Sequence, residues 1–94
     1  MKHATDKELD EIDDLLVAVR SYGELKEKKR GIFYYKSSAF LHFHEDAAGL
    51  FADLRVGDKF KRFGVNTPTE RKKLQTILKT VLRETDLKRP RRSP

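Results

Sequence analysis

Hydrophobic positions near the start of the chain repeat with helical spacing. A stripe of apolar residues recurs at intervals of three and four: Leu9, Ile12, Leu16 and Val19. This spacing places them on one face of a helix. Thr5 and Glu8 precede the stripe at the spacing of an N-terminal capping box. The pattern therefore predicts an amphipathic helix between Thr5 and Gly23.

The end of the chain carries a second helical pattern. Thr67, Pro68 and Glu70 have the residue types and spacing of an N-cap, a first helical position and the closing residue of a capping box. The apolar residues that follow form one stripe: Leu74, Ile77, Leu78, Val81 and Leu82. We expect a helix over about residues 68–84.

Between the helices the hydrophobic period changes from 3.6 to 2, which is typical of strands. The segments 31–36, 38–44, 49–56 and 59–65 are rich in aromatic and aliphatic residues, and turn-forming residues lie at 45–49. Pairing Phe43 with Leu50 places one apolar set on a single face of the sheet: Ala39, Leu41, Phe43, Leu50, Ala52 and Leu54. The other face then carries Phe40, His42, His44, Phe51, Asp53 and Arg55.

Two amphipathic helices and one apolar sheet face predict an α+β fold. We expect a two-layer sandwich, with the N- and C-terminal helices packed on one face of an antiparallel meander of three to four strands. The 94 residues suit one domain, which we place at 1–85. Residues 86–94 are polar, with two prolines and four cations, and predict a disordered basic tail.

Composition excludes several classes of protein. The chain has no cysteine, which rules out a disulfide scaffold, a cysteine-ligated zinc site and a cysteine nucleophile. No apolar run approaches the roughly 20 residues of a membrane span, and the first residues lack the apolar core of a secretory signal. We therefore expect a cytoplasmic protein with no membrane partner.

The net charge of +6 is unevenly distributed. Residues 1–22 carry three cations and six acids, whereas residues 55–94 carry thirteen cations and four acids, a net charge of +9. The cations predict non-specific binding to nucleic-acid phosphates through Lys61, Arg62, Arg71, Lys72, Lys73, Lys88, Arg89, Arg91 and Arg92. The alternative is a solvated helix face followed by a solubilising tail.

A second hypothesis concerns the polar face of the central hairpin. His42 and His44 are two residues apart and share a face with Asp53, so their side chains converge on a candidate metal or acid–base site. The alternative is a half-exposed sheet surface with local ion pairs. The sequence contains no nucleophile–base pattern and no phosphate-binding glycine loop. We therefore assign no catalytic residue and no cofactor, and expect a binding module rather than an enzyme.

The aromatic residues of the strands leave two further interpretations open. Tyr34 and its neighbours lie among the cations Lys28, Lys29, Arg30 and Lys36, a composition typical of surfaces that stack bases and hold phosphates. Strand alternation requires that about half of these rings are core instead. An exposed patch around Phe40 and Phe51 would favour a protein partner at the open sheet face.

The segments 31–55 and 60–70, which include FLHFHED and GLFADLR, resemble a small bacterial family of conserved hypothetical proteins. That family has no assigned activity, so the resemblance implies no site residues. The helix–sheet–helix order is also similar to frataxin and to double-wing DNA-binding proteins. The first likeness implies an iron-binding acidic helix, and the second implies nucleic-acid binding.

Overall fold

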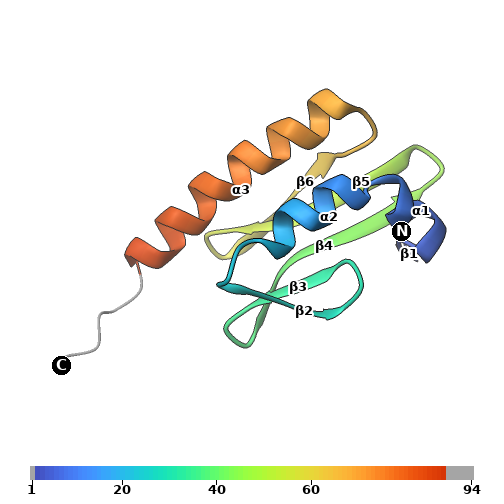
Figure 1. Ribbon diagram of the computed structural model, residues 1–94. Coiled ribbons are helices and arrows are strands. Elements are labelled where there is room, and N and C mark those ends of the chain that lie inside the picture. The colour runs from blue at the N-terminus through green and yellow to red at the C-terminus, as the bar shows by residue number, and fades with distance from the viewer. Residues whose placement is uncertain (1, 89–94) are drawn as a thin grey trace.

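A computed structural model describes residues 2–88 of the chain (Figure 1). Helices and strands follow in the order β1 (Lys2–His3), α1 (Asp6–Glu11), α2 (Asp13–Arg20), β2 (Leu25–Lys29), β3 (Ile32–Tyr35), β4 (Ser38–Asp46), β5 (Gly49–Val56), β6 (Lys59–Gly64) and α3 (Pro68–Lys88). The helices α2 and α3 lie on the same side of an antiparallel sheet. The predicted α+β class, with helices on one sheet face, is confirmed.

The sheet contains more strands than the sequence pattern predicts. Five strands form a meander in the order β2–β3–β4–β5–β6, and β1 pairs with β4 beyond the end of β3. The strand β2 reads LKEKK, which has too few apolar residues to be recognised as a strand. The segment is a strand because it pairs with β3, and its composition alone does not favour a strand.

The predicted register of the central hairpin is wrong by two residues, although most side chains lie on the predicted face. Phe43 lies opposite Ala52 rather than Leu50, and Glu45 lies opposite Leu50. The reason is that β4 continues to Asp46, which leaves only Ala47 and Ala48 as the turn. A shift of two residues preserves side-chain alternation, so Leu41, Phe43, Leu50, Ala52 and Leu54 are still on the buried face. Ala39 is the exception, because it pairs with Tyr34 on the other face.

Phe40 lies on the core face, which corrects its predicted place on the polar face. The pairing of β3 with β4 steps from Tyr34–Ala39 to Phe33–Leu41, so Phe40 is the extra residue of a β-bulge. A bulge breaks strict alternation, and both Phe40 and Leu41 are buried, at 1% and 0% exposure. Phe40 therefore cannot contribute to an exposed patch with Phe51.

The first predicted helix is divided in two at Ile12. The backbone there leaves helical geometry, at φ −117° and ψ 28°, and the Ile12 N–H donates to the Leu9 carbonyl at 3.1 Å. The hydroxyl of Thr5 contacts the Glu8 carboxylate, while the Thr5 N–H donates to Glu45 of β4. The predicted stripe is nevertheless buried along its whole length: Leu9, Ile12, Leu16 and Val19.

The capping box of α3 forms as predicted. The Glu70 N–H donates to the Thr67 hydroxyl at 3.1 Å, and the Thr67 N–H donates to the Glu70 carboxylate at 3.2 Å. The helix extends four residues beyond its predicted end, so residues 86–88 of the predicted tail are helical. Residues 89–94 of that tail lie outside the described residues. Within residues 2–88, every helix is too short or too polar to cross a membrane.

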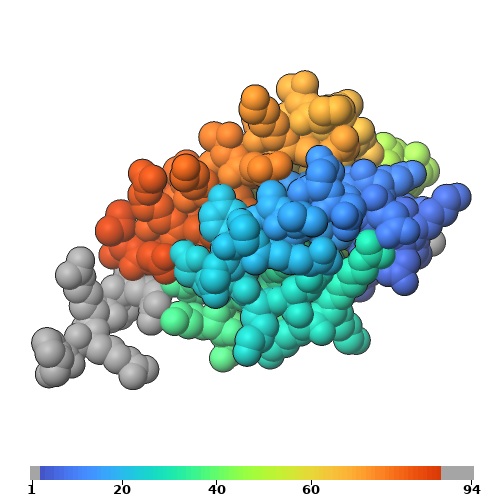
Figure 2. Space-filling model, viewed as in Figure 1, coloured from blue at the N-terminus to red at the C-terminus, as the bar shows by residue number. Residues whose placement is uncertain are grey.

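The hydrophobic core lies between the helices and one face of the sheet. Figure 2 shows α2 packed directly beside α3 over the sheet. The largest fully buried side chains come from both layers: Phe33, Phe40 and Phe43 from the sheet, and Ile12, Leu15, Leu16, Leu74 and Leu78 from the helical segments. One sheet face is thus fully used for packing.

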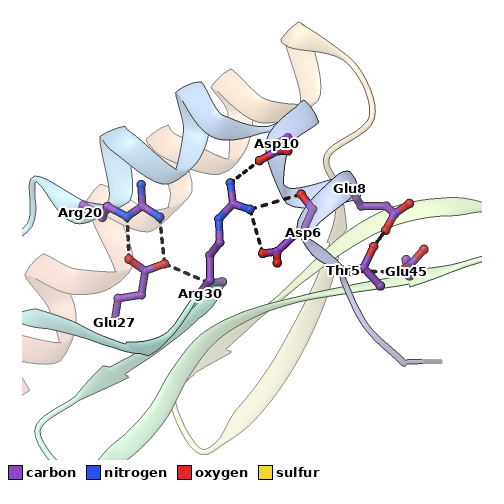
Figure 3. Close-up of polar contacts among 9 residues, drawn as sticks. Thr5, Asp6, Glu8, Asp10, Arg20, Glu27, Arg30 and Glu45 are labelled. Atoms are coloured by element: carbon purple, nitrogen blue, oxygen red, sulfur yellow. Dashed lines mark hydrogen bonds and ion pairs between the residues drawn. The ribbon is translucent and has the colours of Figure 1, made fainter.

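Ion pairs connect the helical layer to the hairpin formed by β2 and β3 (Figure 3). Arg20 of α2 donates two hydrogen bonds to Glu27 of β2, at 2.6 and 3.1 Å. Arg30 in the hairpin turn pairs with Asp6 and Asp10 of α1, at 2.9 and 2.6 Å. Two of the acids on the first helical segment are therefore balanced within the molecule.

Candidate functional site

The sheet face opposite the helices carries the polar and aromatic residues of the strands. We call it the bare face and define it by the alternate positions of the strands: Tyr34 and Ile32 on β3, His42 and His44 on β4, Phe51, Asp53 and Arg55 on β5, and Phe60 and Arg62 on β6. No helix within residues 2–88 covers this face. Its side chains are therefore available to a ligand.

One register row crosses the centre of the bare face. Ile32, His42, Asp53 and Arg62 are direct partners on four successive strands. The sequence predicted His42 and Asp53 as diagonal neighbours. The corrected register places them directly opposite each other, where side chains on one face approach closest.

His42, His44 and Asp53 converge into one cluster. Nδ1 of His42 lies 2.5 Å from Nε2 of His44, and that Nε2 lies 3.3 Å from Oδ2 of Asp53. One potential ligand atom from each residue lies within 4.8 Å of the others. His3 of β1 adds a third imidazole, which stacks on His44 with ring centroids 5.0 Å apart.

Asp53 is a buried carboxylate, only 8% exposed. Arg62 donates from its Nε and one terminal nitrogen to the two carboxylate oxygens, at 2.9 and 3.1 Å. These hydrogen bonds from Arg62 hold the pKa of Asp53 below its usual range, against the opposing effect of burial. Asp53 is therefore ionised at neutral pH.

Unlike Asp53, which favours its charged form, His42 favours its neutral form. Burial, together with the nearby His44 ring, lowers the pKa of His42 despite the attraction of the Asp53 charge. Its imidazole is therefore predominantly neutral at pH 7, which leaves a nitrogen lone pair that can accept a proton or bind a metal ion.

Aromatic rings and cations surround the cluster. Phe60 is 41% exposed, and its ring lies 5.0 Å from that of His42. The Arg55 guanidinium lies over Phe60 at 4.7 Å, and the Lys28 ammonium lies over Tyr34 at 4.8 Å. These are favourable cation–π geometries. The bare face therefore presents π-surfaces together with positive charge.

The charge on the bare face is positive. By register and contact, the strands direct five cations to it: Lys26, Lys28, Lys29, Arg55 and Arg62. The same alternation directs the carboxylates of Asp46 and Asp53 to it. The helical layer, which carries the acids of residues 6–14, lies on the opposite face. These strand residues therefore give the bare face a net positive charge, which favours an approaching anion.

The structure does not place all of the predicted basic residues on one surface. Arg62 lies on the bare face, whereas its neighbour Lys61 lies opposite the core residue Leu54 and so faces the helical side. Arg71 donates to the Val65 carbonyl at 3.0 Å and lies 3.8 Å from an Asp14 oxygen, in a partly buried position. It is therefore committed to contacts within the fold.

The remaining predicted cations belong to α3 or follow it. Lys72 and Lys73 are exposed on α3, on the helical side of the molecule. Lys88 is the last described helical residue, and Arg89, Arg91 and Arg92 lie outside the described residues. Their predicted role in nucleic-acid binding stays a prediction.

Sequence reasoning missed His3 and Phe60 as members of the site. Phe60 and Arg62 are two residues apart on one strand, so alternation alone would have grouped them once β6 was placed beside β5. His3 gave no such signal, because a two-residue strand in a charged segment has no readable period.

Comparisons with family models, with curated proteins and with solved structures find no match for this chain. The resemblance to a bacterial family stays a prediction. The chemistry of the bare face is the basis for proposing a function.

Proposed function

We propose that the protein binds single-stranded nucleic acid on the bare face of its sheet. The observation that supports this most directly is the exposed Phe60 ring, with the Arg55 guanidinium 4.7 Å above it. Exposed sheet aromatics stack unpaired bases, and neighbouring cations neutralise the phosphates. Lys28 and Tyr34 repeat the same combination on the same face, towards the other edge of the sheet.

The arrangement of these residues suits an extended strand. Tyr34 lies opposite Ala39, and the Arg55 Nε donates to the Ala39 carbonyl at 3.0 Å. Arg55 therefore lies between Tyr34 on β3 and Phe60 on β6. A single strand crossing the sheet would meet a ring, a cation and a second ring in succession. A base can stack on Tyr34 when the exposed Lys28 side chain turns towards a phosphate, and on the exposed part of the Phe60 ring.

The test measures binding of labelled single-stranded RNA and DNA by fluorescence anisotropy, with the matching duplexes alongside. We expect single strands to bind more tightly than duplexes, because only unpaired bases can stack on the sheet. Affinity should also fall as salt rises from about 50 to about 200 mM, since phosphate neutralisation releases counterions.

Two variants separate stacking from general charge. Phe60→Ala should weaken single-strand binding by about ten-fold or more, because a base–aromatic stack is worth about 1–3 kcal/mol, whereas Phe60→Tyr should retain it. The matched control is Lys72→Ala with Lys73→Ala on α3, which should change affinity by less than about three-fold. If the lysine variant weakens binding and Phe60→Ala does not, the binding surface is the basic C-terminal part of the chain. Absence of binding at low salt would reject a nucleic-acid function.

A further inference from the structure

We propose that His42, His44 and Asp53 form a binding site for one divalent transition-metal ion of the zinc class. The site goes beyond nucleic-acid binding and does not depend on it. All three residues come from β4 and β5, two adjacent strands that are each paired on both sides. Ligands on such interior strands are held with little freedom, so the site is largely formed before a metal arrives.

One of the distances between ligand atoms matches that around a tetrahedral ion. Zinc binds imidazole nitrogen and carboxylate oxygen at about 2.0–2.2 Å, which separates neighbouring ligand atoms by about 3.3–3.5 Å. The observed distance from His44 Nε2 to Asp53 Oδ2 is 3.3 Å. The nitrogens of His42 and His44 lie closer, at 2.5 Å, and would have to separate by about 1 Å to hold an ion.

The facing nitrogens of the two imidazoles offer two donor atoms to a single cation. Two facing nitrogens at 2.5 Å cannot both carry a proton, so one must present its lone pair to the other. A metal ion between them would take the place of that proton and accept both lone pairs.

Arg62 can remain in place when the metal binds. Its Nε donates to Oδ1 of Asp53, whereas the oxygen that faces His44 is Oδ2. Coordination would displace only the second hydrogen bond, at 3.1 Å, from the other guanidinium nitrogen. The remaining bond would orient the carboxylate, as outer-shell partners of metal ligands commonly do.

Two imidazoles and one carboxylate leave a fourth position for solvent or a ligand. The donor set of nitrogen and oxygen suits zinc, cobalt and nickel better than calcium or magnesium, which prefer oxygen ligands alone. The exposed edge of the cluster lies beside Phe60 and Arg62, on the bare face. The open position would therefore face any ligand bound to that surface.

The test uses the full chain without nucleic acid, so failure of either proposal leaves the other standing. Zn²⁺ binding is measured by calorimetry, and Co²⁺ binding by the visible absorption of tetrahedral cobalt. We expect one ion per chain. Removal of an outer-shell partner lowers metal affinity by about 10- to 100-fold. The near-isosteric variants His42→Gln, His44→Gln and Asp53→Asn remove ligands themselves, so each should lower the affinity for Zn²⁺ by more than that.

His3→Gln is the matched control, because His3 stacks on His44 but lies outside the three-residue cluster. It should bind Zn²⁺ within about three-fold of the unchanged protein. Circular dichroism of each variant checks that the fold persists, and ¹⁵N shifts of the His42 and His44 rings locate the ion independently. Absence of Zn²⁺ binding would overturn the site. A Zn²⁺ affinity that is the same in His42→Gln and His44→Gln as in the unchanged protein would also overturn it. A loss in His3→Gln equal to that in His44→Gln would overturn the ligand set.

Discussion

Phe40 shows how one residue can belong to a different layer from the one its sequence position indicates. Strict alternation along β4 would place it beside His42 on the bare face, yet it is 1% exposed and its ring lies 5.7 Å from that of Tyr35 in the core. The bulge is the cause, because it gives two successive residues the same orientation. Phe51, by contrast, remains half-buried on the bare face.

The two phenylalanines should therefore differ in their effect on stability. Phe40→Ala is expected to lower the free energy of unfolding by about 3–5 kcal/mol, because it leaves a cavity in the core. Phe51→Ala, the matched control, should cost about 1 kcal/mol, since its ring is already partly solvated. Urea unfolding followed by circular dichroism measures both, and equal losses would contradict the core position of Phe40.

At the scale of the site residues, alternation predicted part of the cluster and missed the rest. The prediction grouped His42, His44 and Asp53 correctly, because a register shift of two residues leaves each side chain on the same face of the sheet. The partners Arg62 and Phe60 were not assigned to that group, because the position of β6 relative to Asp53 depends on pairing between strands. Long-range pairing of this kind leaves no local signal in the sequence.

The turn between β4 and β5 is constrained by its contact with Asn66. Gly49 has φ +127°, and a Cβ built on it would lie 2.4 Å from Oδ1 of Asn66. The Asn66 side chain in turn bonds both backbone groups of Leu50, at 2.8 and 3.0 Å. The start of β5 is therefore fixed to the connection that leads into α3.

Gly49→Ala should destabilise the fold for two separable reasons, the unfavourable φ and the collision with Asn66. We expect Gly49→Ala to cost about 2–4 kcal/mol. Its cost should be smaller by about 1 kcal/mol in an Asn66→Ala background, where the collision is removed.

The control for this double-mutant cycle is Gly57→Ala. Gly57 has φ +69° with open space where a Cβ would lie. Its cost should be smaller and should add to that of Asn66→Ala. Additive costs for Gly49→Ala and Asn66→Ala, measured by urea unfolding, would argue against the collision.

Helices were easier to predict than strands for a physical reason. The α3 cap and stripe are both local, so Thr67, Glu70 and the apolar spacing were sufficient to place its start. The strand β2 is stabilised by pairing with β3 and by the hydrogen bond from Arg20 to Glu27. Neither contact can be predicted from the polar sequence of β2 itself. The break at Ile12 was also hidden, because the buried stripe continues across it.

At the scale of the whole molecule, the two layers are joined at one edge by charged groups as well as by the core. Burial raises the pKa of Glu27, but the hydrogen bonds from Arg20 and from the Gly31 N–H outweigh it, so the pKa lies below the ordinary 4.5. A depressed carboxyl pKa means that the native state favours the ionised form. This contribution to stability is complete above the ordinary pKa and is lost as the pH falls through the native value.

Glu27→Gln should therefore lower the free energy of unfolding by about 1–2 kcal/mol near pH 7. The difference from the unchanged protein should shrink as the pH falls below about 4.5, because both side chains are then uncharged. Urea unfolding at several pH values measures this dependence. Glu24→Gln, at an exposed position just before β2, should stay within about 0.5 kcal/mol throughout. A pH-independent difference for Glu27→Gln would contradict the ionic contribution.

Because Phe40 is the extra residue of a bulge, deleting it and replacing it have different effects on the sheet. The pairs on either side, Tyr34–Ala39 and Phe33–Leu41, would become consecutive if Phe40 were deleted, and every other side chain of β4 would keep its face. Phe40 thus behaves as a one-residue insertion in an otherwise regular ladder. Its ring lines a pocket with Tyr35 and with Thr85 in the last turns of α3. A shortened chain would retain its strand pairing and lose the aromatic support beneath the end of that helix.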